Sequence, residues 1–215
     1  MKDYKYLLLF QWLLINLVGF FLLGLTGVYG GINLVLVADQ TYMSVLIFGV
    51  FLWGFILSGI KVFQTSRELN FARDINKKSR WENVIAGLNN DRIGHTKTIE
   101  ILKIKMFEQT IWIKWIANSL VLLGLVGTVV GFIIALSGIH PALVTDVSVI
   151  AKVVSTLISG MGTALYTTLV GAVFNLWLSA NYLLLSSGIA KLLALVLRSK
   201  VVDETILVEA NSGNV

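Results

Sequence analysis

Four long runs of apolar residues constrain this 215-residue chain more than any other feature of its sequence. The runs extend over about residues 6–28, 42–63, 116–139 and 147–185. The hydrocarbon core of a bilayer is about 30 Å thick, and a helix of roughly 20 apolar residues crosses it. Each run is long enough for one crossing, so the sequence predicts an all-α membrane protein with four transmembrane helices.

The composition excludes several other classes of protein. Charged residues make up 13% of the chain, whereas soluble domains carry about 25%. Together with the 56% of hydrophobic residues, this argues against a soluble enzyme, a disordered chain and a nucleic-acid-binding module. Lys2 and Lys5 precede the first run as they would in a signal peptide. The run is nevertheless longer than the roughly 7–15 apolar residues of a signal peptide, so we expect a retained helix.

The basic residues indicate the orientation of the spans. In a four-span arrangement, sixteen of the seventeen Lys and Arg residues fall on one side of the membrane, and only Lys152 lies near the other. Loops rich in Lys and Arg face the cytoplasm. Both termini and the segment between the second and third spans are therefore predicted to be cytoplasmic, and the net charge of +5 reflects this topology.

The spans divide the chain into four parts. Residues 1–63 contain the first two transmembrane helices, and residues 64–110 form a cytoplasmic helical segment with a break at 87–91, where the sequence reads Gly-Leu-Asn-Asn-Asp. Residues 111–202 contain the last two transmembrane helices with a cytoplasmic extension. Residues 203–215 form a short C-terminal tail, which we expect to be partly disordered.

Ionisable residues are missing from the interior of the predicted spans. Lys152 lies near the outer end of the fourth span, where its long side chain can reach the membrane surface. Proton pumps and intramembrane proteases depend on acidic or nucleophilic groups at membrane depth, so we predict no catalytic residue and no enzyme. His95 and His140 lie on opposite sides of the membrane and there is no cysteine, so we predict no metal site.

Small and hydroxyl residues line one face of each of the last two spans. At about 100° per residue, the third span carries one such stripe and the fourth span another. The stripes consist of Gly124, Thr128, Gly131 and Ala135, and of Gly160, Ala164, Thr168, Gly171 and Asn175. Small residues allow membrane helices to pack closely, and that alone accounts for the stripes. Alternatively, the threonine hydroxyls contribute to a polar path through the membrane.

Two motifs on these stripes resemble those of a known family. The segment 124–131, Gly-Leu-Val-Gly-Thr-Val-Val-Gly, resembles the G-L-x-G-T-v-x-G segment of the MotA/TolQ/ExbB proton-channel family. The segment 164–171, Ala-Leu-Tyr-Thr-Thr-Leu-Val-Gly, resembles the A-L-x-x-T-x-x-G segment of the family's following helix. The resemblance covers about residues 115–182, roughly a third of the chain.

This resemblance implies a motor of the bacterial inner membrane. Members of the family form a homopentamer around a dimer of a single-span partner of the MotB/ExbD/TolR type, which supplies the membrane aspartate. Flow of H⁺ or Na⁺ is thought to rotate the pentamer around the dimer, and no cofactor other than the translocated ion is implied. The threonines that match Thr128 and Thr168 face the pore, with Thr167 and Thr163 as neighbours. The residues implied to pack the helices around the pore are Gly124, Gly127, Gly131, Gly160, Ala164 and Gly171.

Departures from the family pattern refine the expectation. Thr163 stands where the ExbB and TolQ branches commonly have Glu, and those branches have three spans rather than four. Both points favour a MotA-like branch. The segment 64–110 is much shorter than the torque-generating domain of that branch, so the sequence does not indicate what the motor drives. It does not decide between H⁺ and Na⁺ either, although H⁺ is favoured. A four-helix membrane scaffold without ion conduction is the alternative. A small self-assembling transporter is a third reading, which the missing carboxylate weakens.

Overall fold

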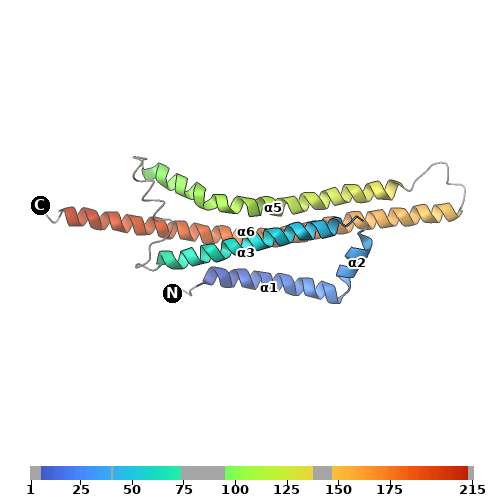
Figure 1. The fold of residues 1–215 in the computed structure, drawn as a ribbon, viewed down its shortest axis with the longest axis horizontal. Coiled ribbons are helices and arrows are strands. Elements are labelled where there is room, and N and C mark those ends of the chain that lie inside the picture. The colour runs from blue at the N-terminus through green and yellow to red at the C-terminus, as the bar shows by residue number, and fades with distance from the viewer. Residues whose placement is uncertain (1–5, 40, 74–94, 138–146, 213–215) are drawn as a thin grey trace. The chain divides into compact units, whose positions relative to one another are not determined.

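The computed structural model describes residues 6–39, 41–73, 95–137 and 147–212, and this part of the chain contains helices and no strands (Figure 1). The helices are α1 (Leu7–Val28), α2 (Gly31–Ala38), α3 (Met43–Arg73), α5 (His95–Ser137) and α6 (Val147–Ser212). Four of them contain stretches long and apolar enough to cross a membrane. These stretches are Leu7–Val28, Met43–Phe71, Thr110–Ser137 and Ile150–Arg198. The prediction of an all-α protein with four membrane spans is thus confirmed.

Three helices continue well past the length that a bilayer requires. α3 has 31 residues, α5 has 43 and α6 has 66, compared with about 20 for one crossing. α6 ends at Ser212 and therefore includes residues 203–212 of the predicted C-terminal tail. The predicted break at 87–91 lies outside the described residues.

The outer connection between the first two spans contains a helix that the sequence did not predict. Gly30 has a φ of 75°, a left-handed conformation that glycine adopts readily, and it turns the chain from α1 into α2. Figure 1 shows α2 turned aside from α1, leading to the start of α3. With 8 residues, α2 is too short to cross a bilayer.

The chain divides into two compact units. One comprises residues 1–14, 58–112 and 181–215, and the other comprises residues 15–57 and 113–180. The core of the first unit is aliphatic. Its buried side chains include Val62, Leu69, Leu102, Met106, Leu185 and Leu192.

Aromatic side chains form much of the core of the second unit. Phe51 of α3 stacks on Phe174 of α6, with ring centroids 4.4 Å apart. Trp177 of α6 contacts Phe20 of α1 edge to face, with centroids 5.1 Å apart, and its indole N–H donates to Asn16 Oδ1 over 2.8 Å. Such ring pairs stabilise a fold beyond the area they bury. They hold α1 and α3 against α6, the helix that carries the second motif.

Candidate functional site

The two motif-bearing helices, α5 and α6, pack with their backbones in contact. A methyl group on Gly160 would lie 2.5 Å from the backbone nitrogen of Ala135 and 2.6 Å from the carbonyl oxygen of Gly131. A methyl group on Gly131 would lie 2.6 Å from the backbone nitrogen of Ala164, and one on Gly171 would lie 2.6 Å from the carbonyl oxygen of Leu120. Only glycine permits this approach, which is the arrangement that small residues provide in membrane helices.

The same helix crossing includes the remaining glycines of the first motif. A methyl group on Gly124 would lie 3.2 Å from the Cα atom of Thr168, and one on Gly127 would lie 2.5 Å from the hydroxyl oxygen of Thr167. The small residues of both motifs therefore bring α5 and α6 together. As a consequence, Thr128 of α5 lies beside Thr168 of α6.

Thr128 of α5 and Thr168 of α6 form a hydroxyl pair between the helices. Their Oγ1 atoms are hydrogen-bonded to each other, and each hydroxyl also lies 3.1 Å from the carbonyl oxygen of Gly124. The Thr168 side chain is exposed and that of Thr128 is half-buried. A hydroxyl group has one proton to donate and two lone pairs to accept with. The hydroxyl pair can therefore still accept a hydrogen bond from a group outside the protomer.

Thr163 and Thr167, the other two predicted site residues, lie in the interior of the protomer. Both are fully buried. The Thr167 hydroxyl donates to the carbonyl oxygens of Thr163, over 2.9 Å, and Ala164, over 3.1 Å, in its own helix. The Thr163 hydroxyl donates to the carbonyl oxygen of Ala38 in α2 over 2.6 Å. The structure thus brings Thr128 and Thr168 together and separates Thr163 and Thr167 from them.

Asp39, which the sequence analysis did not single out, has a structural role. Asp39 is buried between α2 and α3, and its carboxylate accepts hydrogen bonds from the N–H of Ser44, over 2.5 Å, and the N–H of Thr41, over 3.1 Å. Burial raises the pKa of Asp39, but these hydrogen bonds favour the charged form and bring the pKa below the ordinary value of 3.8. The sequence does contain a pattern that predicts this role. An acidic residue shortly before an apolar helical run often accepts hydrogen bonds from the first N–H groups of the helix.

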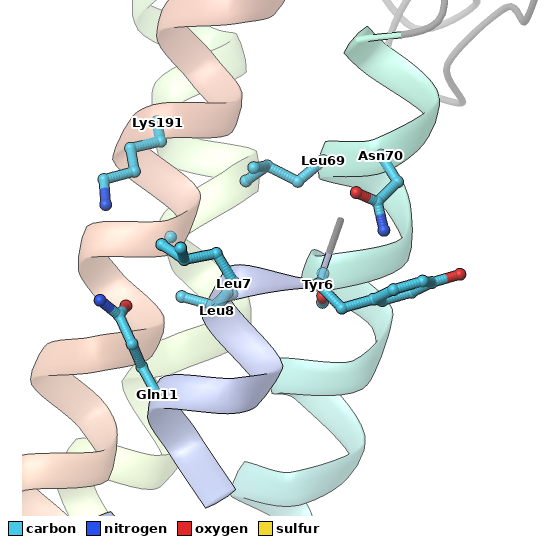
Figure 2. A pocket seen from close by; sticks show the side chains of 9 residues that line it. Tyr6, Leu7, Leu8, Gln11, Leu69, Asn70 and Lys191 are labelled. Atoms are coloured by element: carbon cyan, nitrogen blue, oxygen red, sulfur yellow. The ribbon is translucent and has the colours of Figure 1, made fainter. Parts of the chain in front are cut away.

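A small hollow in the other compact unit has room for about one water molecule. Figure 2 shows it between Leu8 and Gln11 of α1, Asn70 of α3 and Lys191 of α6, and its volume is about 30 Å³. Ser66 Oγ and Asn70 Nδ2, which lie on its wall, are buried and have no hydrogen-bond partner in the described part of the chain. The hollow is too small for a ligand larger than water.

These features define the class of the protein. It is a multi-pass helical membrane protein whose last two spans pack through glycines and present paired hydroxyl groups. The chain belongs to the MotA/TolQ/ExbB proton channel family, whose family model matches residues 72–196, more than half of the chain. The resemblance drawn from the two motifs is thereby confirmed.

Membership assigns a general role to the chain. The family supports a function of the ion-channel and motor-stator type, and it is a family of membrane channels rather than a class of enzymes. The match begins at residue 72 and so also includes much of the segment between the second and third spans. No curated protein and no solved structure matches the chain.

Proposed function

We propose that this chain is the ion-conducting subunit of a MotA-like stator in a bacterial inner membrane. Five copies surround a dimer of a single-span partner of the MotB/ExbD/TolR type, with both termini of each copy in the cytoplasm. H⁺, or alternatively Na⁺, flows down its electrochemical gradient and rotates the pentamer around the dimer. The rotation performs mechanical work on a further component of the cell envelope.

The hydroxyl pair of Thr128 and Thr168 is the observation that carries this proposal. The pair lies at the edge of the α5–α6 crossing, where Thr168 is exposed. A hydroxyl group donates to a carboxylate and accepts from a protonated carboxyl group, so it can contact both states of a titrating partner. A fixed charge at this place would bind one state too tightly for rapid turnover. Threonine therefore suits the wall of an ion path.

The titrating carboxyl group comes from the partner in this proposal. α1 and the apolar stretches of α5 and α6 contain no Asp or Glu, and Glu68 of α3 lies at the cytoplasmic end of its span. An ionisable group at membrane depth is the usual means of proton transfer across a bilayer. A channel built from this chain needs such a group from another polypeptide.

The alternative is a membrane scaffold without ion conduction. The glycine contacts between α5 and α6 favour it to the extent that they explain both stripes by packing alone. The stripes therefore do not separate the two functions. The bond between the two hydroxyl groups can also hold the helices of a scaffold together. The exposure of Thr168 is what favours the ion path, because it leaves the hydroxyl group within reach of another polypeptide.

Replacement of either hydroxyl group tests the proposal. Thr128→Val and Thr168→Val keep the shape of the side chain and remove its hydrogen-bonding group. We expect each to lower ion flux about tenfold, the effect of losing roughly 1.4 kcal/mol of hydrogen bonding at the path. Flux is measured in proteoliposomes that contain the chain together with its single-span partner, under a proton gradient and separately under a sodium gradient.

Thr156→Val in α6 is the matched control. The Thr156 hydroxyl donates to the Lys152 carbonyl oxygen one turn earlier in its own helix. We expect this variant to conduct like the wild type. Wild-type flux in both Thr128→Val and Thr168→Val, with assembly intact, would reject the pore assignment and favour the scaffold.

A further inference from the structure

An apolar cavity lies within the compact unit formed by residues 15–57 and 113–180. Its volume is about 530 Å³, within the range of roughly 300–1,000 Å³ that is typical of ligand sites. Four helices contribute to its wall. Representative lining residues are Leu23 of α1, Val35 of α2, Val45 and Phe48 of α3, and Val173 of α6.

The wall of this cavity has few groups that could form hydrogen bonds to water. No charged side chain lines it. The hydroxyl group of Thr26, one of its few polar members, donates within α1 to the carbonyl oxygens of Leu22, over 3.0 Å, and Leu23, over 2.8 Å. An internal water needs two to four polar partners, and apolar cavities without them stay dry. The fitting occupant is therefore an apolar molecule or chain.

The cavity lies at membrane depth, close to one face of the bilayer. Thr26 is in the last turn of α1 and Val45 is in the first turn of α3, and both helices are candidate membrane spans. Tyr29 and Tyr42, which follow and precede these spans, are 82% and 77% exposed. Tyrosine gathers at the membrane–water interface. The cavity is thus surrounded by acyl chains, and the orientation proposed above places it in the outer leaflet.

The short helix α2 borders the cavity without being covered by the rest of the chain. None of its residues is buried, and its apolar side chains Leu34 and Leu36 are each 52% exposed. Its C-terminal end is nevertheless held firmly. The Thr163 hydroxyl binds the carbonyl oxygen of Ala38, and Asp39 binds the start of α3. α2 is therefore fixed beside a space that this chain does not fill.

We propose that this cavity binds one acyl chain of a membrane phospholipid. A helix with its side chains is about 10–12 Å across, whereas a single hydrocarbon chain is much narrower and can follow an irregular space. A flexible hydrocarbon chain needs no such width, and the wall that it meets is almost entirely apolar. This inference concerns lipid binding and does not depend on ion conduction.

Photo-crosslinking tests the proposal directly. The wild-type protein is reconstituted with a phospholipid that carries a diazirine in its acyl chain, irradiated, digested and analysed by mass spectrometry. We expect adducts on cavity residues such as Val35 and Leu169. Val45→Trp fills the cavity and should abolish these adducts. Val18→Trp is the matched control, because Val18 is 47% exposed and Val45 50%, but Val18 does not line the cavity.

The outcomes that overturn the proposal are equally specific. Wild-type adducts confined to outward residues such as Leu17 and Phe21 would reject it, and so would cavity adducts that persist in Val45→Trp. Cross-links from the cavity to a second copy of the chain would show that a neighbouring protomer is the occupant. If Val45→Trp loses helical content, Val173→Trp can be used to fill the cavity from α6 instead. The distribution of adducts in the wild-type protein decides whether lipid occupies the cavity, whichever variant is used.

Discussion

At the level of single residues, the carboxylate of Asp39 connects the outer helix α2 to the span α3. Because its pKa in the folded protein is lower than the ordinary 3.8, the charged form is favoured by folding. The stabilisation is therefore fully present above the ordinary pKa and is lost as the pH falls through the lowered value. We expect Asp39→Asn to destabilise the protein by about 0.5–2 kcal/mol near neutral pH, the usual cost of losing a helix-start hydrogen bond.

Thermal unfolding in detergent measures this effect. The difference between wild type and Asp39→Asn should shrink as the pH falls below the ordinary carboxyl pKa of 3.8, because the wild-type carboxylate becomes protonated there. Glu108→Gln, at an exposed carboxylate of α5, is the control and should change the unfolding temperature little at any pH. A constant difference between wild type and Asp39→Asn at all pH values would contradict the role of the charge.

The threonines show how far single residues could be predicted from the sequence. The two motifs contain Thr128, Thr167 and Thr168, and Thr163 directly precedes the second motif. The stripe on α6 included Thr168 but not Thr167. Both side chains contact α5, but adjacent helical residues point about 100° apart, so Thr167 is buried in the crossing and Thr168 lies at its exposed edge. Which hydroxyl group is buried depends on the position of the neighbouring backbone: Thr167 lies against Gly127, and Thr163 lies against Ala38. Periodicity alone does not contain that position.

At the level of helices, the crossing of α5 and α6 predicts different effects on stability for substitutions at two glycines of α6. A methyl group on Gly160 would collide with the backbone of α5, whereas the nearest atom to one on Gly162 would be the Ala38 Cβ, at an ordinary 3.9 Å. We expect Gly160→Ala to cost about 1–3 kcal/mol, the usual cost of overpacking, and Gly162→Ala to cost little. Unfolding in detergent compares the two variants. Equal stability of both would contradict the close backbone contact.

The helices themselves were predictable to different degrees. Long apolar runs locate the four spans, because crossing a bilayer demands both length and uniform hydrophobicity. The short helix α2 escaped prediction, because a run of eight mostly apolar residues after Gly30 also fits a loop. The length of α6 beyond the membrane was hard to predict for another reason. A fall in hydrophobicity marks where a helix leaves the membrane, whereas the helix itself continues to Ser212.

At the level of the whole molecule, one copy of the chain leaves large apolar side chains uncovered along the motif-bearing helices. Val129 and Phe132 of α5 and Leu165 of α6 are each at least half exposed, on helices that also carry the Thr128–Thr168 pair. Lipid can cover such an apolar surface, and so can neighbouring copies of the chain. In the proposed pentamer the hydroxyl pair faces a shared pore and the apolar surfaces face neighbouring copies.

The copy number in detergent, measured by native mass spectrometry with the single-span partner co-expressed, tests that assembly. We expect five copies of the 23.7 kDa chain for every two partner subunits. Thr168→Val should leave this ratio unchanged, since it alters the proposed path but not the helix packing, while Gly160→Ala should lower the yield of the complex. A monomer that persists with the partner present would contradict the motor and leave the scaffold as the better account of the same glycine contacts.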